Sequence, residues 1–213
     1  MCKSENLEMF LDLGFIPKVD RFLIKGELNE PETLYPLTVH LCIECGLAQL
    51  GYIIPDHELF DENYAYEAST TKTRHENHNQ LAESVCNRFS IEKNSFVVDI
   101  GSNVGMLLEC FKNKGMKVLG IDASANIAEK ANSKGIETIL GFFNQEIVTE
   151  IKNTKGLASV ITATNVFAHI QDYQSFIIAL KNLLKDKGVF VFQVPHFLTL
   201  LKNIEYDTIY HEH

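Results

Sequence analysis

The alternation of strand-like and helix-like segments from residue 96 onwards constrains the fold of this chain most strongly. Apolar runs such as SFVVDIG, MKVLGID and VFVFQVP are separated by amphipathic segments of helical period, several of which end at a glycine. The clearest helical segment is YQSFIIALKNLLKDKG, which we expect to end at Gly188. Strands that alternate with helices in this way form βαβ units around a parallel sheet. We therefore predict an α/β domain whose parallel sheet is flanked by helices.

Two zones of different composition precede this domain. The first has short apolar clusters, and the alternation in LTVHLCIEC predicts a strand that enters a turn. The second contains no glycine or proline, and the fourfold spacing of Leu81, Val85 and Phe89 predicts a helix from Thr73 onwards. The expected parts are a small module over residues 1–60, a helical linker over 61–95 and the α/β domain over 96–213.

Composition restricts the class of protein. Hydrophobic residues make up 46% of the 213 residues and the formal net charge is −9, so a sizeable core is expected and a basic surface for nucleic acid or anionic membrane is not. No apolar run reaches transmembrane length, and the acidic N-terminal segment does not have the pattern of a signal peptide. We expect a cytoplasmic monomer or homodimer with no nucleic-acid or membrane partner. Its five cysteines should be thiols or metal ligands rather than disulfides.

A glycine-containing loop, VVDIGSNVG, follows the first strand of the α/β domain and opens a helix. Gly101 permits a tight turn, and Gly105 lets the start of the helix pack closely on the strand. Asp99 lies near the strand end, where it can accept hydrogen bonds from a ligand. Asp122 ends the next strand, where a carboxylate can accept hydrogen bonds from both hydroxyls of a ribose.

The residues around these glycines favour a nucleoside without phosphates. A dinucleotide fingerprint requires glycine where this chain has Asn103 and Met106, so a pyrophosphate has no close approach to the backbone. S-adenosylmethionine is a nucleoside ligand that suits the pattern. The alternative is a glycine turn with a surface aspartate in another kind of α/β protein. The segment ATNVFAHIQD lies where a further strand should end, over the same sheet edge. The candidate cofactor-binding residues are Asp99, Gly101, Ser102, Asn103, Gly105, Asp122, Ala123, Asn165 and His169.

A C-x-x-C-G knuckle in the N-terminal zone raises the question of a metal. Structural zinc takes four thiolate or imidazole ligands in a tetrahedron. Cys42 and Cys45 supply one knuckle, and Cys2 is the cysteine available for a second. His40 lies too close to Cys42 in sequence to complete a good tetrahedron. Two interpretations stay open: a structural zinc site that has lost a ligand, or a buried cysteine pair without metal.

The motifs together resemble a known family. The segments YPLTVHLCIECGLAQL, DIGSNVGMLL, NVFAHIQD and YDTIYHEH are similar, in this order, to the S-adenosylmethionine-dependent sugar C-methyltransferases, which act on nucleotide-linked 4-keto-deoxy sugars. The resemblance covers nearly the whole chain. It implies a zinc-binding module, a Rossmann-like class I methyltransferase domain and a C-terminal domain of similar size. We therefore expect this chain to be a piece that lacks a few residues in front and the last domain. Val104 departs from the family, which usually has a polar or acidic residue there.

The resemblance also implies an acid–base site. Carbon methylation beside a ketone needs a base for the α-proton and a donor to the enolate oxygen, roles that suit histidine and tyrosine. The implied base is His213, in the terminal YHEH. The implied supporting residues are Tyr210 and Glu212, which orient the base or bind the sugar, His211 as a neighbour, and Tyr64, for which Tyr66 is the alternative. The other interpretations of YHEH are a charged tail and a metal site, and the latter has no evident fourth ligand.

Two other functions stay open beside the C-methyltransferase. One is a module that binds S-adenosylmethionine without a competent acceptor site. The other is methylation at oxygen or nitrogen, which needs no strong base for a carbon acid.

Overall fold

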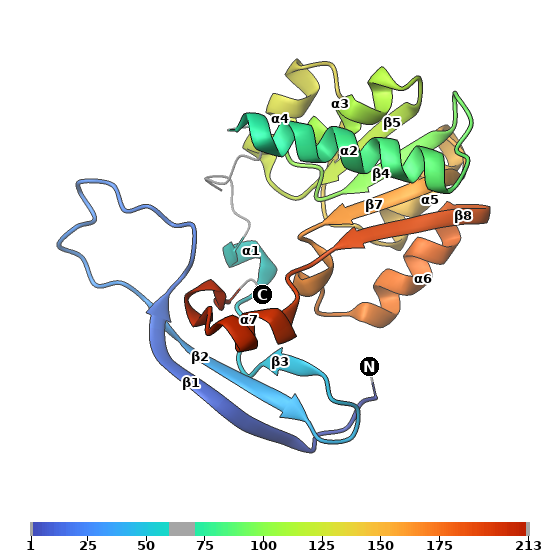
Figure 1. Cartoon of the computed structure of the whole chain (residues 1–213). Helices are drawn as coiled ribbons and strands as arrows, with labels where there is room; N and C mark the ends of the chain where they lie inside the picture. The colour runs from blue at the N-terminus through green and yellow to red at the C-terminus, as the bar shows by residue number, and fades with distance from the viewer. Residues whose placement is uncertain (1, 60–70, 212–213) are drawn as a thin grey trace. The chain divides into compact units, whose positions relative to one another are not determined.

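A computed structural model of the chain describes residues 2–59 and 71–211 (Figure 1). The chain divides into two compact units. The first combines residues 1–65 with residues 195–213, and the second comprises residues 66–194. We describe each unit by itself.

The second unit is built on a five-stranded sheet in which every strand pairs in parallel with its neighbours. The strand order is β6-β5-β4-β7-β8, so the chain starts in the middle of the sheet, moves to one edge and then crosses to the other. The strands are β4 (Phe96–Ile100), β5 (Lys117–Asp122), β6 (Thr138–Leu140), β7 (Ala158–Thr164) and β8 (Leu184–Gln193). The predicted parallel α/β fold is therefore confirmed.

Helices cover both faces of this sheet, which explains why its central strands are apolar without alternation. The helices are α2 (Lys72–Arg88), α3 (Met106–Asn113), α4 (Ala125–Ser133), α5 (Gln145–Thr154) and α6 (Tyr173–Leu183), with the short 3-10 helix η1 (Phe167–His169). Val97 of β4 packs in one core cluster with residues of α2 and α3. Val98 and Ile100 pack in the other cluster with residues of α5 and α6. Helix α2 begins on the side of the sheet to which the arrowheads of β7 and β8 point (Figure 1).

Two details of this unit differ from the sequence prediction. Helix α6 ends at Leu183, so the prediction that it continues to Gly188 is wrong. Leu183 is fully buried and completes the apolar face of the helix, whereas Leu184 has an extended backbone and pairs with Ala158 of β7. The sheet thus takes up the following charged residues as the start of β8. Helix α5 was not predicted, and it begins at an N-cap where the Asn144 side chain accepts a hydrogen bond from the Ile147 amide.

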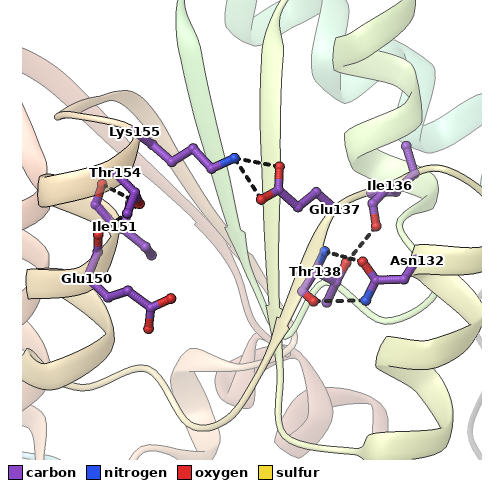
Figure 2. A network of polar contacts seen from close by, with 8 residues as sticks. All are labelled: Asn132, Ile136, Glu137, Thr138, Glu150, Ile151, Thr154 and Lys155. Atoms are coloured by element: carbon purple, nitrogen blue, oxygen red, sulfur yellow. Dashed lines mark hydrogen bonds and ion pairs between the residues drawn. The ribbon is translucent and has the colours of Figure 1, made fainter.

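Edge strand β6 is held at its start by side chains rather than by a further strand (Figure 2). The Asn132 amide nitrogen donates to the Thr138 carbonyl at 2.9 Å, and the Thr138 amide donates back to the Asn132 side-chain oxygen at 3.1 Å. Lys155, which follows α5, pairs with Glu137 at 2.6 Å. These contacts satisfy backbone groups at a sheet edge and connect β6 to helices on both sides of the sheet.

The first unit is a small antiparallel sheet with additional helices. Strand β2 lies in the middle, between β1 and β3. The elements are β1 (Leu7–Pro17), β2 (Leu34–Cys42), β3 (Ala48–Leu50), α1 (Asp56–Leu59), α7 (Phe197–Asn203) and the 3-10 helix η2 (Tyr206–Thr208). Leu37, Val39 and Ile209 form its buried core, so the C-terminal segment packs on the N-terminal sheet. In addition, the rings of Phe10 and Phe197 meet edge to face at 6.2 Å.

Within the described part of the chain, we find no helix that combines the length and the apolar character needed to cross a bilayer.

Candidate functional site

The loop between β4 and α3 has an unusual backbone. Gly101, Asn103 and Gly105 all have positive φ angles, of 65°, 50° and 81°. Gly105 also caps α3 in the left-handed conformation. The amides of Gly101 and Ser102 both donate to the Ile121 carbonyl of the neighbouring strand, at 2.8 and 3.1 Å. The chain therefore turns sharply beside the carboxyl end of β5, as the sequence predicted.

Neighbouring side chains fill the space that a larger residue would need at either glycine. A Cβ atom at Gly101 would collide with Val166 Cγ2, and one at Gly105 would lie 2.7 Å from Ile136 Cγ2. The contact with Val166 also shows that the segment after β7 touches this loop. Both glycines are thus required by backbone angle and by close approach.

Gly101→Ala is expected to destabilise the protein more than a glycine replacement that only strains the backbone. Gly156 is a matched control, because it also has a positive φ, of 89°, but a Cβ there meets nothing within 4 Å. Strain in the left-handed region costs about 1–2 kcal/mol at either site, and overpacking against Val166 should add about 1–3 kcal/mol at Gly101. Urea unfolding measures both. Equal losses in the two variants would show that the collision is relieved without cost, and Val166→Ala should restore part of the loss.

Asp122 holds the loop from the adjacent strand. Its Oδ2 accepts a hydrogen bond from the Asn103 amide at 2.8 Å, and its Oδ1 accepts one from the Ser124 amide at 3.0 Å. Burial raises the pKa of Asp122, while the amides of Ser124 and Asn103 lower it. Each carboxylate oxygen has a further lone pair, so Asp122 can still accept hydrogen bonds from a ligand. Ala123 follows it directly at the sheet edge.

Asp99 is almost inaccessible, with 2% of its surface exposed. Thr162 of β7 donates a hydrogen bond to its Oδ1 at 2.6 Å. Burial raises the pKa of Asp99 to about 7, the Thr162 hydrogen bond opposes that rise, and the charge of Asp122 adds to it. Thr162 was not among the candidate residues from the sequence. A signal was present, because it is a hydroxyl residue in the middle of a buried strand, although the strand also buries Ser159.

The remaining candidates of this unit follow β7. Asn165 has a φ of 56°, and its amide donates to the Gln193 carbonyl of β8 at 2.8 Å. His169 ends η1 and is half-buried. Because β7 is the parallel neighbour of β4, these residues lie at the same sheet edge as Asp99 and the glycine loop. Val104, the departure from the family pattern, is buried and points no polar group toward this edge.

The first unit brings the three candidate metal ligands together. The sulfur atoms of Cys2, Cys42 and Cys45 lie within 4.8 Å of one another, and those of Cys2 and Cys42 are 3.5 Å apart. The knuckle is closed by a hydrogen bond from the Gly46 amide to the Cys42 carbonyl. The amide of Leu47 lowers the pKa of the Cys45 thiol. Three thiols in this arrangement fit three corners of a tetrahedral zinc site.

His40 is not part of this cluster. Its Nε2 lies 3.1 Å from the Thr38 hydroxyl oxygen. Among the described residues, the cluster therefore holds three ligands, and a fourth ligand is not identified in them.

The candidate acid–base residues are only partly described. His211 is 3% exposed, and its Nε2 donates to the Pro36 carbonyl of β2 at 3.2 Å. Burial lowers the pKa of His211, and its ring lies edge to face with Tyr35 at 5.8 Å. Tyr210 is half-buried beside it. The other candidates, Tyr64 with its alternative Tyr66, Glu212 and His213, lie outside the described residues.

Comparisons with known proteins fit this geometry. Residues 1–60 match a family described as "Putative zinc binding domain", and residues 73–213 match a family described as "Methyltransferase domain". Among solved structures, the PH0226 protein of Pyrococcus horikoshii OT3 is similar with a TM-score of 0.52 at 16% identity, over 66% of this chain and 67% of that one. At this identity the likeness concerns the fold alone.

Two curated relatives illustrate the range of similarity. The C-methyltransferase NovU of Streptomyces niveus is 37% identical over all 213 residues, which correspond to 50% of its own length. A ubiquinone biosynthesis O-methyltransferase of Pasteurella multocida is 32% identical over 107 residues, 45% of this chain and 44% of that protein. The chain thus spans about half the length of the curated relatives it matches. Since the methyltransferase model covers residues 73–213, well over half of the sequence, the chain belongs to the methyltransferase family.

Proposed function

We propose that this chain is the zinc-module and cofactor-binding part of an S-adenosylmethionine-dependent C-methyltransferase. Its acceptor would be a nucleotide-linked 4-keto-deoxy sugar, methylated at the carbon beside the ketone. The observation that carries the proposal is the loop between β4 and α3, whose backbone is held by Asp122 and has glycine at the two positions that Val166 and Ile136 approach closely. The whole-chain similarity to a C-methyltransferase supports carbon as the methylated atom.

The loop suits a nucleoside better than a dinucleotide. Met106, which occupies a position where a dinucleotide fingerprint has glycine, is buried as the first residue of α3. The start of this helix is therefore filled by a side chain rather than left open for a pyrophosphate. Asp122 would accept hydrogen bonds from the ribose, while Asp99, Ser102 and Asn103 line the turn beside it. Ala123, Asn165 and His169 complete the proposed cofactor-binding set at the same sheet edge.

The acid–base roles rest on the family resemblance of the terminal YHEH. S-adenosylmethionine supplies an electrophilic methyl group when it is bound. His213 would remove the proton from the acceptor carbon, and a tyrosine, Tyr210 or Tyr64, would donate to the oxyanion that develops. Glu212 would orient the base. His211 donates to a backbone carbonyl of β2, which supports a positioning role for it beside Tyr210.

Turnover distinguishes this proposal from a module that only binds the cofactor. The full chain is incubated with methyl-labelled S-adenosylmethionine and a nucleotide-linked 4-keto-deoxy sugar, and the product is analysed by mass spectrometry. We expect a label bonded to carbon that resists mild hydrolysis. Label on oxygen would support the O-methyltransferase alternative. Cofactor binding without any labelled product would support the binding module, an outcome consistent with a chain that spans half of its relatives.

We also propose that Cys2, Cys42 and Cys45 hold a structural zinc ion. The chain purified in the presence of zinc should contain about one zinc per molecule by elemental analysis. Cys42→Ser is expected to lose most of the metal and to lower the melting temperature of the first unit. Cys86→Ser is the matched control, because Cys86 is a free, half-buried thiol outside the cluster. Equal zinc content in the two variants would contradict this assignment.

A further inference from the structure

The buried carboxyl of Asp99 and the hydroxyl of Thr162 form a pair inside the second unit. The two residues are directly opposite each other in the β4–β7 register, and they are 2% and 0% exposed. Their hydrogen bond is short, at 2.6 Å. A carboxyl group in such a site is costly to ionise, because it has given up its hydration and has gained a single neutral donor in return.

The neighbouring residues of the sheet shield this pair from solvent. Asp99 pairs on its other side with Gly120, which in turn pairs with Thr138. Ser102 and Thr138 side-chain oxygens occupy the space over Gly120. Among the described residues, the Ser102 hydroxyl is buried without a hydrogen-bond partner. The loop that would contact the cofactor therefore rests on a buried polar layer that contains one titratable group, Asp99, beside the more accessible Asp122.

We propose that Thr162 is a positioning residue for the cofactor site that acts through Asp99. In this proposal Asp99 carries a proton in a large fraction of the free protein, and the cationic cofactor drives that proton into solvent when it binds. The Thr162 hydroxyl then donates to the carboxylate that remains. One O–H bond of Asp99 breaks, its electron pair stays on the carboxylate, and no other bond changes. The inference rests on the proposed binding of S-adenosylmethionine at this loop.

The direction of the pH effect follows from linkage. Asp99 has a pKa of about 7 in the free protein, and a nearby positive charge lowers the pKa of a carboxyl group. Below that pKa, binding must expel a proton, so affinity should fall by up to about tenfold for each pH unit. Above it, the carboxylate is already formed, and affinity should become independent of this group. Since the Thr162 hydrogen bond lowers the pKa of Asp99, its removal should shift the midpoint to higher pH.

Other groups near this face of the sheet must be considered. Asp122 on β5 acts on Asp99 through its charge. From α3, the buried thiol of Cys110 belongs to the same core cluster as the neighbouring sheet residues. On α2, His78 and Arg74 lie on the helix face of the core residues Ala82 and Val85, and burial lowers the pKa of His78. A substitution at Thr162 removes the hydrogen bond to Asp99 and leaves these other groups in place. A shift that it causes can therefore be assigned to Asp99.

The experiment compares wild type, Thr162→Val and Thr162→Ser. Valine keeps the branched shape and removes the hydroxyl, whereas serine retains the hydroxyl. Calorimetric titration with S-adenosylmethionine in buffers of different ionisation enthalpy counts the protons released on binding. Each protein is titrated at three pH values: one unit below the wild-type midpoint of Asp99, at that midpoint, and one unit above it. Wild type and Thr162→Ser should release close to one proton at the lowest pH and almost none at the highest. Thr162→Val should still release a large fraction of a proton at the highest pH.

A second measurement follows the titration of Asp99 in the protein without cofactor. Carbon-13 NMR of the Asp99 carboxyl, assigned by its loss in Asp99→Asn, should show a midpoint near neutral pH that rises in Thr162→Val and not in Thr162→Ser. Identical midpoints in wild type and Thr162→Val would overturn the inference, as would equal proton release in the two proteins. If the NMR midpoints shift as expected but S-adenosylmethionine gives no binding heat in any variant, the proposed function fails and the linkage to that cofactor fails with it. If S-adenosylmethionine binds but the NMR midpoint of Asp99 is the same in wild type and Thr162→Val, the inference fails and the proposed function stands.

Discussion

Asp122→Ala is expected to reduce the affinity for S-adenosylmethionine by at least about 100-fold, because charge-assisted hydrogen bonds of about 1.5–3 kcal/mol each are lost. The carboxylate accepts from the Asn103 and Ser124 amides at 2.8 and 3.0 Å, and we propose that it also accepts from the ribose. Alanine therefore removes ligand contacts and releases the backbone of the loop at the same time. Isothermal titration calorimetry measures the loss.

Two further variants serve as controls for this prediction. Asp122→Asn retains one acceptor oxygen and a similar shape, so we expect an intermediate affinity and a melting temperature closer to that of wild type. Asp186→Ala removes an exposed acid from β8 and should bind as wild type does. Wild-type affinity in Asp122→Ala, with folding confirmed by circular dichroism, would exclude this carboxylate from the cofactor site.

His213→Ala is expected to lower methyl transfer by about 100-fold to 10,000-fold, the range in which a positioned general base contributes. The affinity for S-adenosylmethionine should stay unchanged, because the proposed role of His213 lies at the acceptor. A proton-exchange assay isolates the step: in heavy water, the wild-type protein should exchange the proton beside the ketone, and the variant should not. This assay reports on the base even where methyl transfer is slow.

The control for this second prediction is another histidine of the same segment. His196 is exposed and precedes the first residue of α7, and its Nδ1 lies 2.7 Å from the Thr199 hydroxyl oxygen. His196→Ala should retain both exchange and methyl transfer. Loss of exchange in His196→Ala to the same extent, or full exchange in His213→Ala, would remove His213 as the base.

The fold of the second unit could be predicted because its signals are local. Buried parallel strands are continuous apolar runs. Gly115 and Gly135 follow the ends of α3 and α4 and have positive φ angles, as expected of glycines that terminate helices. The end of α6 could not be predicted from local sequence signals. Leu184 has a good helical propensity, and its extended conformation follows from pairing with Ala158, a contact distant in sequence.

The first unit was less accessible to sequence reasoning. Strand β1 is exposed along most of its length, so it has no alternation of buried and exposed residues. Its partner β2 has buried Leu37 and Val39, which gave the predicted strand. The packing of Ile209 against them joins segments from the two ends of the sequence and has no local signal.

The turn of the glycine loop and the Cys42–Cys45 knuckle could be predicted because each depends on residues close together in sequence, whereas Cys2 joins the knuckle from 40 residues away. The contact between Thr162 and Asp99 could not be predicted, because the two residues lie on different strands and their pairing depends on strand order. The acid–base residues came from family resemblance rather than from physical reasoning. They remain a prediction, because Tyr64, Glu212 and His213 lie outside the part of the chain that the structure describes.

The central claim is that the loop between β4 and α3 binds a sulfonium-bearing nucleoside, and calorimetric titration of the unmodified chain with S-adenosylmethionine tests it most directly. We predict saturable binding at one site per chain, competition by S-adenosylhomocysteine and no competition by NAD. Absence of binding heat from a folded sample, or displacement of the ligand by NAD, would contradict it.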